Sequence, residues 1–550
     1  MSWARRRAHA ELAAALESWA RLQQVHSKSS HNAYGLSSIW IEYEDFLYSN
    51  YPYPETHPAR LWALGRLHGL RPVDPTRCRV LELGCGLGGN LTAMAVALPG
   101  SHFVGVDRSA RQVAVGTELI RTLQLRNIEL ITADLLDFDP GPEPFDYVLC
   151  HGVYSWVPEA VQERILHLMQ RSLSPDGIGY ISYNTLPGWH MRGMLRDLLR
   201  RAAGEGLPAE RLARARDLLT LLAETPAERS AAQAFLASEV RLLGQLGDEY
   251  LLYEHLVECN RPCYFEDFMA AAARHGLAYV TDAQCASALR GRLGENALRA
   301  AEVPGNPIAT EQRLDFLEVR FFRRSLLCHA AAAHLCEPGW ETLRGLLLST
   351  NLTPLSDELD LGSESVEEFR GSGDRGISVH RPLLKAALWL LYEHRPRGLD
   401  LDTLCSEAHR LLRGRRRVSK GALAQLGESL LDLLARGFVE VSAPVPVYVT
   451  RPGPRPSTTA LVRLQASRRL PGCTNLRHES VAVDDLDRCL LQRLDGSYSV
   501  KELGELLLSD TRDAGFTVEM GGHEVCDREG MTWAAARRLE QLGRSAFLLS

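Results

Sequence analysis

The segment VLELGCGLGGN, residues 80–90, constrains the fold of this 550-residue chain more than any other stretch. It is an apolar run that ends in closely spaced glycines, and a helical pattern, NLTAMAVAL, follows at residues 90–98. Glycines between a strand and a helix let the backbone approach a ligand closely and leave the first helical N–H groups free to bind it. The segment therefore predicts a ligand-binding turn between a strand and a helix.

Strand and helix patterns alternate from residue 79 to residue 183, which predicts βαβ units around a parallel sheet. The expected strands lie at 79–84, 102–107, 128–134, 145–150 and 178–183, the expected helices at 90–98, 110–125 and 159–173, and a turn, SPDG, at 174–177. Because the carboxyl ends of parallel strands meet at one edge of a sheet, a ligand is expected at that edge.

The glycines of this turn also satisfy the pattern GxGxxG of dinucleotide-binding proteins. Asp107 follows about twenty residues later, where such proteins carry a ribose-binding acid. The glycine pattern alone therefore does not separate NAD enzymes from methyltransferases. Glu82, two residues before the first glycine, would repel a pyrophosphate and suits a cationic ligand. Asp134, in TADL after the third strand, is well placed to hydrogen-bond an adenine amino group.

Together these features resemble the class I S-adenosylmethionine (SAM) methyltransferases. The resemblance implies SAM as the cofactor and S-adenosyl-L-homocysteine as its product, with no metal. It implies that the glycine turn holds the amino-acid part of SAM, Asp107 the ribose hydroxyls and Asp134 the adenine. The expected cofactor-binding residues are Tyr53, Glu82, Gly84, Gly86, Gly88, Asn90, Asp107, Asp134, Leu135 and His151.

Three aromatic strings stand where a methyl acceptor is expected: YPYPETHPARL (51–61), CHGVYSWVP (150–158) and YISYNTLPGWH (180–190). With RVLELGCGLGGN, they resemble the bacterial protein-lysine methyltransferase-like family, whose studied members in intracellular bacteria methylate outer-membrane proteins. That family pairs the SAM domain with a methyltransferase regulatory domain, which residues 236–283 resemble. Residues 323–329 and the segments near 381–412 and 474–508 are similar to its later portions.

The resemblance implies methyl transfer to a protein side chain, with lysine as the expected acceptor. A lysine ammonium has no lone pair, and its unperturbed pKa of about 10.4 makes deprotonation at pH 7 cost about 4–5 kcal/mol. An apolar, aromatic site lowers that pKa, and ring faces attract the cation. The residues expected to carry acceptor chemistry are Tyr154, Trp156, Tyr183, Asn184 and Trp189.

Several aromatic and histidine residues also have purely structural interpretations. Trp189, after Pro-Gly, suits a packing anchor for the next helix, and Tyr180 suits the core side of its strand. His151 could bind SAM or the acceptor, whereas His57 precedes Pro58 in a turn and is expected to be structural. Tyr53 either covers SAM or packs the N-terminal segment onto the sheet.

The predicted fold is a Rossmann-like, doubly wound α/β sheet of the class I SAM methyltransferase type, followed by a helical domain and C-terminal winged-helix-like modules. Residues 3–25 read as a helix, and Pro52, Pro54 and Pro58 predict no regular element over 48–60. Two helix-turn-helix echoes, at 387–412 and 489–508, suit winged-helix modules or ordinary helical bundling. The predicted parts are 1–60 (helix and lid segment), 61–205 (SAM domain), 206–300 (helical regulatory domain), 301–380 (linker or insert), 381–445 and 446–550 (winged-helix-like modules).

The composition of the chain limits the binding partners that can be expected. The net charge of -6 argues against nucleic acid, although RGRRRVSK at 413–420 is a basic run. Twelve scattered cysteines include no CxxC pair, so zinc is not expected, and free thiols suit a reducing cytoplasm. The sequence contains no run of about eighteen apolar residues, so no membrane span is expected. We expect a cytoplasmic enzyme with a protein or peptide substrate, and its large additional parts also suit homodimerisation.

Two other functions fit the same residues. One is methyl transfer to a small molecule or a pathway-made peptide. The other is SAM binding by a regulatory protein that performs no turnover, because an intact cofactor motif says nothing about acceptor chemistry.

Overall fold

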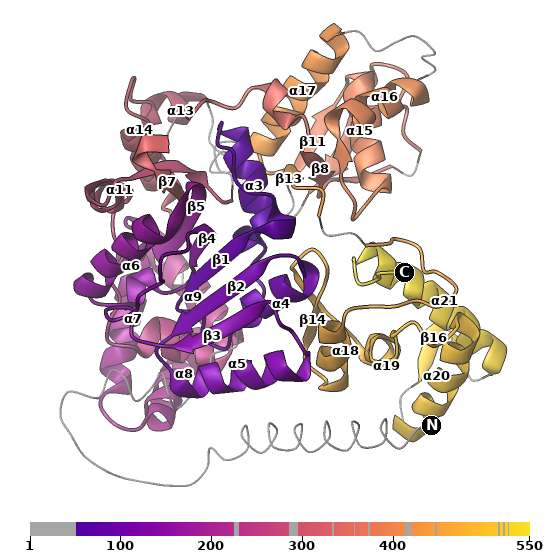
Figure 1. Ribbon diagram of the computed structural model, residues 1–550, viewed down its shortest axis with the longest axis horizontal. Helices are drawn as coiled ribbons and strands as arrows, with labels where there is room; N and C mark the ends of the chain where they lie inside the picture. Colours follow the sequence, from indigo (N-terminus) through magenta and orange to yellow (C-terminus); the bar gives the residue numbers. More distant parts are fainter. Residues whose placement is uncertain are drawn as a thin grey trace.

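The computed structural model describes residues 51–550 except 225–229, 285–294, 333–334, 357, 372–374, 413–419, 446–447, 515–516, 521–522 and 526. The helix predicted at 3–25 and the basic run at 413–419 lie outside the described residues. Three bodies follow one another along the chain (Figure 1): an α/β body (51–332), a middle module (335–445) and a C-terminal module (448–550).

A seven-stranded sheet forms the centre of the α/β body, in the order β3-β2-β1-β4-β5-β7-β6. Strands β1 to β5 pair in parallel, whereas β7 runs antiparallel to both of its neighbours. The strands are β1 (Arg79–Leu83), β2 (His102–Asp107), β3 (Ile128–Thr132), β4 (Phe145–Cys150), β5 (Leu173–Asn184), β6 (Leu277–Asp282) and β7 (Phe322–His329). The predicted parallel sheet is confirmed. The predicted turn at 174–177 instead belongs to β5, where the pairing with β4 shifts register.

Both faces of the sheet are buried, which explains why its strands read as continuous apolar runs. Val80 packs on the face covered by α3 (Pro58–Leu67), α4 (Gly89–Ala97) and α5 (Ala110–Thr122). Leu81 and Leu83 pack on the opposite face, against α6 (Glu159–Ser172) and α11 (Phe265–Arg274). Successive residues of β1 therefore contribute to two separate cores.

The helical segment is an insertion between β5 and β6, not a body that follows the sheet. Its elements are α7 (Gly188–Ala203), α8 (Pro208–Glu224), α9 (Ala231–Gln245), α10 (Asp248–Tyr250), the π-helix η4 (Leu251–Leu256) and α11. Helices α13 (Glu295–Ala301) and α14 (Pro307–Glu318) then connect β6 to β7. The boundary predicted between residues 300 and 301 thus falls between two strands of one sheet. Strand β6 was missed because six residues beside helical patterns give little periodic signal.

The middle module contains regular structure where a linker was predicted. Strands β8 (Leu347–Thr350), β9 (Thr353–Pro354), β10 (Glu367–Arg370) and β11 (Gly376–Val379) lie within the predicted linker, after η5 (Ala330–Ala332) and η6 (Trp340–Leu343). They are followed by α15 (Pro382–Glu393), β12 (Leu399–Asp400), α16 (Leu401–Leu411), α17 (Lys420–Ala435) and β13 (Val439–Ser442). The sheet β12-β8-β13 takes its central strand from the predicted linker. This module therefore begins before residue 381.

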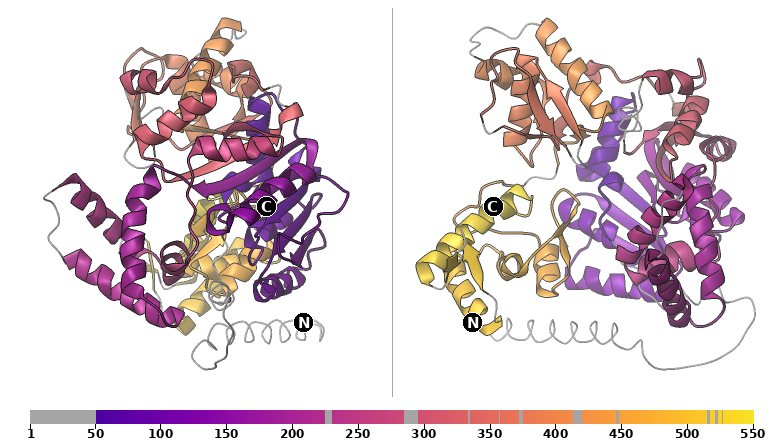
Figure 2. Two further views of the ribbon diagram at one scale, coloured as in Figure 1. Left: turned by 90° about the vertical axis from the view of Figure 1, so that its left-hand side faces the viewer. Right: turned by 180° about the vertical axis from the view of Figure 1, so that it is seen from behind.

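In its described residues, the C-terminal module combines four helices with two short hairpins. Its elements are α18 (Ala460–Ser467), β14 (Gly472–Thr474), β15 (Ser480–Ala482), α19 (Asp485–Leu491), α20 (Val500–Ala514), β16 (Val518–Met520), β17 (His523–Val525) and α21 (Arg528–Arg544). Figure 2 shows this module (yellow) and the middle module (orange) as separate bodies that both border the α/β body. Helix α18 lies against α4, the helix that follows the glycine turn.

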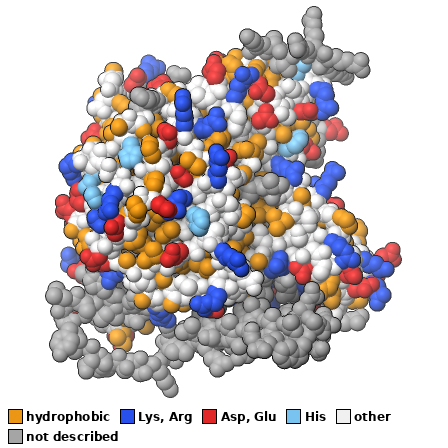
Figure 3. Space-filling view, viewed as in Figure 1, with side chains coloured by type: hydrophobic (Ala, Val, Ile, Leu, Met, Phe, Trp, Pro, Cys, Tyr) orange, Lys and Arg blue, Asp and Glu red, His pale blue; other side chains and the backbone are white. Residues whose placement is uncertain are grey.

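Charges of both signs are interspersed over the face of the molecule seen in Figure 3. Among the described residues on that face, Lys and Arg side chains do not gather into an extended surface of positive charge. Within the described part of the chain, no helix has the length and apolar character needed to cross a membrane.

The proline-rich segment before residue 60 is regular in the structure, contrary to the prediction. It forms η1 (Pro54–Thr56), the helix α3 begins at Pro58, and η2 (Pro75–Arg77) follows. His57 caps α3, since its Nδ1 accepts a hydrogen bond from Ala59 N–H at 3.2 Å. Proline is well tolerated in the first turn of a helix because that N–H has no intrahelical partner. A proline cluster therefore started a helix here.

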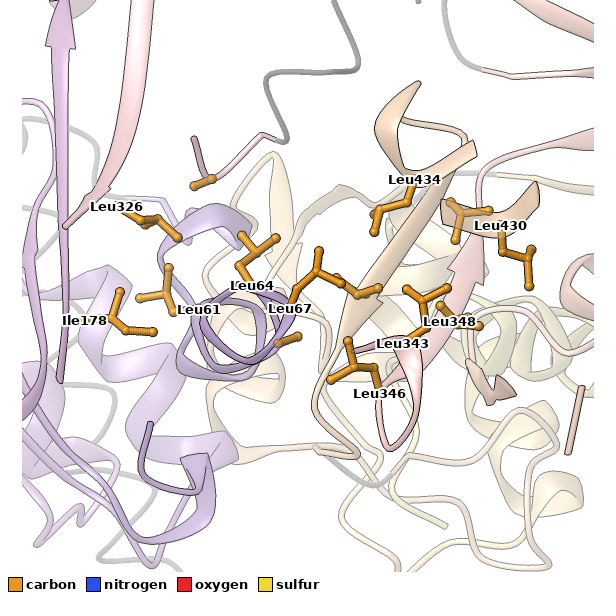
Figure 4. Packing of buried hydrophobic residues seen from close by; sticks show 14 of the residues in the cluster. Leu61, Leu64, Leu67, Ile178, Leu326, Leu343, Leu346, Leu348, Leu430 and Leu434 are labelled. Atoms are coloured by element: carbon orange, nitrogen blue, oxygen red, sulfur yellow. The ribbon is translucent and has the colours of Figure 1, made fainter. Parts of the chain in front are cut away.

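Helix α3 joins the α/β body to the middle module. Figure 4 shows its leucines between residues of the sheet on one side and leucines of the middle module on the other. The residues of this continuous core include Leu61, Leu64, Leu67, Ile178, Leu326, Leu343, Leu346, Leu348, Leu430 and Leu434. The backbone of the same helix also contacts the middle module, because Ala443 N–H donates to Ala59 O at 3.0 Å.

We expect Leu64→Ala to destabilise the protein by about 2–5 kcal/mol, because it leaves a cavity at a side chain that is 1% exposed. Urea unfolding of the full chain, followed by tryptophan fluorescence, measures the change. The matched control is Leu207→Ala, a leucine that is 67% exposed, for which we expect a change within about 0.5 kcal/mol. Similar values for the two variants would contradict the joining role of α3.

Candidate active site

A cavity of about 330 Å³ lies at the carboxyl ends of β1, β2 and β4, the edge at which the parallel sheet was predicted to bind a ligand. Nine of the fifteen predicted site residues line it: Tyr53, Glu82, Gly84, Gly86, Asp107, Asp134, Leu135, His151 and Trp156. The other lining residues are Cys85, Arg108, Gln112, Gly152, Val153, Val157, Val161, Tyr253, Glu254, Val257, Cys259 and Phe322.

The glycine turn forms the floor of this cavity. The N–H groups of Gly84 and Cys85 donate to the carbonyl of Val106, at 2.8 and 3.0 Å, which anchors the turn to β2. Gly84 has φ +76°, and a Cβ there would lie 2.4 Å from Val153 Cγ2. Only glycine fits this position without displacing the chain after β4. Gly88 does not line the cavity, since it caps α4 and faces Leu130.

Glu82 is a buried carboxyl, and only one of its two oxygens has a hydrogen-bond partner among the described residues. Its Oε1 accepts a hydrogen bond from Asn90 Nδ2 at 2.8 Å, whereas Oε2 is buried and has no hydrogen-bond partner among the described residues. Burial raises the pKa of Glu82 to about 8, and nearby Asp107 raises it further while the Asn90 hydrogen bond lowers it. A cationic group in the cavity would satisfy this oxygen and stabilise its charge.

Two acids stand at the ends of the neighbouring strands. Asp107 is buried, and its carboxylate accepts from Gly86 N–H at 2.8 Å and from Ser109 N–H at 2.9 Å. Asp134 is exposed and accepts from Leu136 N–H at 2.9 Å. Asp107 therefore ties the glycine turn to the end of β2, and Asp134 keeps one carboxylate oxygen near the cavity rim.

Gln112 is a second buried polar side chain in the cavity wall that lacks hydrogen-bond partners among the described residues. This side chain, in the first turn of α5, is 1% exposed, lines the cavity, and neither of its amide atoms has a partner among the described residues. A buried amide without hydrogen bonds costs free energy, so a ligand with polar groups is expected there. Buried Gln112 and Glu82 together fit a cofactor with a cationic end and a polar nucleoside, as SAM has.

Aromatic rings surround His151 at the other side of the cavity. Its ring centroid lies 3.8 Å from that of Tyr53 and 6.3 Å from that of Phe322, and Nδ1 is 2.9 Å from the Tyr180 hydroxyl. Burial lowers the pKa of His151 to about 3, and the positive charge of Arg324 lowers it further. The imidazole is therefore neutral at physiological pH. Tyr180 is buried in the core, as its structural interpretation predicted.

The structure separates the predicted acceptor residues into two groups. Trp156 lines the cavity, and Trp189 packs edge-on against it with ring centroids 6.0 Å apart. Tyr154 and Tyr183 instead lie in the hydrophobic core around Phe268, and Tyr183 stacks on that ring at 4.1 Å. These two tyrosines do not reach the cavity, because their strand and turn direct them toward α11.

Tyr183, Asn184 and Asn90 do not line the cavity, and their side chains are hydrogen-bonded to other residues. The Tyr183 hydroxyl is 2.9 Å from Ser325 Oγ, and burial raises its pKa well above the ordinary value, so it stays protonated. Asn184 donates through Nδ2 to Asn260 Oδ1 at 3.1 Å. Asn90 is fully buried and does not line the cavity, but it is hydrogen-bonded to two residues that do, Glu82 and Tyr53.

Several lining residues were not foreseen from the sequence. Tyr253 and Glu254 lie on the π-helix η4 of the helical insertion, and Phe322 begins β7, so chain topology alone brings them to the cavity. Gln112 carried a usable signal, since it stands in the first turn of the helix after Asp107. Burial raises the pKa of Glu254 to about 7, although Arg192 and Arg196 oppose that shift.

The thiols beside the cavity are not activated. Burial raises the pKa of Cys85 well above its ordinary value, and it raises that of Cys150 as well. Both thiols therefore remain protonated and unreactive at physiological pH. Among the residues that the structure describes, no group of three or more His, Cys, Asp and Glu side chains is arranged to hold a metal ion.

A larger cavity, of about 720 Å³, adjoins the first one. Residues of all three bodies line it, including Glu55, Arg60 and Phe322 of the α/β body, Arg397 and Glu440 of the middle module, and Arg477 and Glu479 of the C-terminal module. Phe322 lines both cavities. The two cavities therefore share Phe322, whose ring centroid lies 6.3 Å from that of His151, as part of their walls.

Comparisons with known proteins agree with this architecture. Residues 80–177 match the family described as "Methyltransferase domain", and residues 247–329 match "Predicted methyltransferase regulatory domain". Residues 454–543 match "PKMT, C-terminal winged helix domain". The protein RP789 of Rickettsia prowazekii (strain Madrid E) is 31% identical over 501 residues, which cover 88% of this chain and 89% of that protein.

Solved structures extend the similarity over nearly the whole fold. PKMT2 from Rickettsia typhi is 28% identical, with a TM-score of 0.83 over 92% of this chain and 100% of that one. The same protein in complex with AdoHcy is similar at 27% identity, with a TM-score of 0.81 and the same coverage. The chain therefore belongs to the bacterial protein-lysine methyltransferase-like family, and it is a class I SAM-dependent methyltransferase with a methyltransferase regulatory domain and a C-terminal winged-helix domain.

Proposed function

We propose that this methyltransferase modifies a protein side chain, and that the acceptor is the ε-amine of lysine. The observation that carries the proposal is the large cavity lined by all three bodies, which shares the wall residue Phe322 with the smaller cavity. A surface built from three bodies suits an extended polypeptide, of which a single side chain enters the smaller cavity. Similarity to PKMT2 over 92% of the chain, including both additional modules, supports the same assignment.

The lining residues divide into a cofactor side and an acceptor side. When bound, SAM supplies an activated methyl group on its sulfonium. We assign its amino group to Glu82, its ribose to Asp107 and its adenine to Asp134 and Leu135, with Gln112 as a further partner of the nucleoside. The backbone of the glycine turn would approach the amino-acid end, because Gly84 and Gly86 carry no side chain there.

The acceptor side has the character that an amine requires. The rings of Tyr53, His151, Phe322 and Trp156 make it apolar, which lowers the pKa of an entering ammonium by desolvation. Ring faces also attract a cation before it loses its proton. Among the residues that line the cavity, Glu254 has a carboxyl with a pKa of about 7, so it can accept the proton that lysine must lose.

Proton release on cofactor binding tests the role of Glu82. Its pKa of about 8 means that the carboxyl is mostly protonated at pH 7 in the free protein, and a bound ammonium would lower that pKa. Binding of S-adenosylhomocysteine should therefore release close to one proton at pH 7 and tighten by up to about tenfold per pH unit between pH 6 and 8. Calorimetry in buffers of different ionisation enthalpy measures the release.

Glu82→Gln is the matched variant, because it keeps an acceptor for Asn90 and removes the titration. We expect it to bind without proton release and without that pH dependence. Unchanged proton release in Glu82→Gln would assign the proton to another group, and no binding of the product by the unsubstituted protein would refute the cofactor assignment itself.

The pH dependence of turnover tests Glu254. A base must be ionised to accept a proton, so kcat/KM should rise as the pH increases through about 7. Glu254→Gln should lower kcat by about 10²–10⁴-fold and lose that rising limb, since a positioned base contributes about that much. The exposed neighbour Glu258 gives the control Glu258→Gln, which should keep the rate and the profile. Equal losses in both variants would refute the assignment.

The acceptor class can be identified with radiolabelled SAM and a bacterial lysate, separated by size after incubation. We expect label in protein bands, and we expect its loss when the lysines of the lysate have first been blocked by reductive methylation. Label that survives blocking would point to another side chain. Label only in small molecules would favour the alternative acceptor class, and binding of SAM without any label would favour a regulatory protein.

A further inference from the structure

A histidine of the C-terminal module reaches the cofactor side of the α/β body. His478 lies in the turn between β14 and β15, where its own N–H donates to Asn475 O at 3.1 Å and Asn475 N–H donates to Glu479 O at 2.9 Å. It has φ +63°, a conformation that is costly for a side chain other than glycine. This turn presents the imidazole, which is 3% exposed, to the first turn of α4.

The partner of His478 is the amide of Asn90. His478 Nε2 lies 2.7 Å from Asn90 Oδ1, and Tyr53 N–H donates to the same oxygen at 3.1 Å. A backbone N–H can only donate, so this atom is the amide oxygen and His478 must donate to it through Nε2–H. Asn90 Nδ2 consequently points away from both groups and donates to Glu82 Oε1 at 2.8 Å.

Hydrogen bonds therefore link His478 through Asn90 to Glu82, which lines the cavity. With Oε1 of Glu82 held by Asn90, the other carboxyl oxygen is left for a ligand, and it has no partner among the described residues. Asn90 is fully buried, and loss of His478 would remove one donor to its Oδ1, which would keep the Tyr53 N–H at 3.1 Å and the Thr56 hydroxyl at 3.2 Å. Both remaining donors lie in the segment before α3, so we expect the amide to shift toward them. Movement of the amide moves the carboxyl that it holds.

The imidazole acts here as an uncharged donor. Burial lowers the pKa of His478 well below its ordinary value, and the charged form of His57, whose ring centroid is 5.2 Å away, would lower it further. Burial also lowers the pKa of His57 to about 4, so both rings are neutral near pH 7. The contact between the two bodies is consequently the same across the physiological pH range.

We propose that His478 is a positioning residue for SAM binding, which makes the C-terminal module part of the cofactor site. It acts through Asn90 on Glu82 and touches neither cofactor nor acceptor. The inference rests on the assignment of Glu82 to the amino group of SAM made above. By linkage, bound cofactor should in turn stabilise the docking of the C-terminal module on α4.

The test compares two ligands that differ only at the amino-acid end, S-adenosylhomocysteine and 5′-methylthioadenosine. His478→Phe keeps a ring and removes the donor, so it should weaken binding of S-adenosylhomocysteine by about three- to tenfold, the usual effect of one hydrogen bond. Binding of methylthioadenosine should be unchanged, which also reports that the variant is folded. His478→Gln, which restores an N–H donor, should recover most of the loss. Calorimetry of the full chain gives both affinities.

A double-mutant cycle identifies the route. If His478 acts through the carboxyl of Glu82, then His478→Phe should have no further effect on S-adenosylhomocysteine binding in a Glu82→Gln background. Equal weakening of both ligands by His478→Phe, no weakening of either, or additive effects in the cycle would each overturn the proposal. Failure of the unsubstituted protein to bind S-adenosylhomocysteine would instead overturn the proposed function.

Discussion

The buried amide of Asn90 is the interaction on which the arrangement of the molecule depends. A fully buried amide must have its two N–H donors and its carbonyl oxygen satisfied, and here three parts of the chain supply the partners. Glu82 and Thr56 accept from Nδ2, at 2.8 and 3.1 Å, while Tyr53 N–H and His478 donate to Oδ1. The segment before α3, the glycine turn and the C-terminal module are thereby held in one relative position.

The sheet provides the second connection between parts that are distant in sequence. Its last two strands, β7 and β6, come from residues 247–329, the regulatory segment, which match the methyltransferase regulatory domain. A buried ion pair fastens β7 to α14, because Arg323 of β7 donates to Asp315 of α14 at 2.8 Å through both Nε and Nη2. Removing one member of such a pair leaves an uncompensated buried charge, which costs about 3–5 kcal/mol. The regulatory segment is therefore structurally part of the catalytic body, and its π-helix brings Glu254 to the cavity.

Prediction from sequence succeeded where a local pattern has one structural meaning. The apolar runs became the five parallel strands, and the glycine turn and its acids meet at the expected edge. It failed where the meaning depends on neighbours that are distant in sequence. Pro58 was read as a break but starts α3, and Tyr183 was read as an acceptor residue but faces Phe268. An aromatic residue at the end of a strand can point to either face, and periodicity alone does not say which face holds the cavity.

The sequence by itself determined the class of fold and the position of the ligand-binding turn, because close backbone approach needs glycine and strand-end acids stand at set distances from that turn. The family and the cofactor followed from the resemblance of these motifs to known methyltransferases. Only the tertiary structure decided which aromatic rings surround the cavity, that Gln112, Glu254 and Phe322 belong to it, and that His478 reaches Asn90 across 388 residues. The physical reason is that these contacts join segments with no local relation in the chain. Their partners are selected by the burial of polar groups, which has no meaning until the three bodies are packed together.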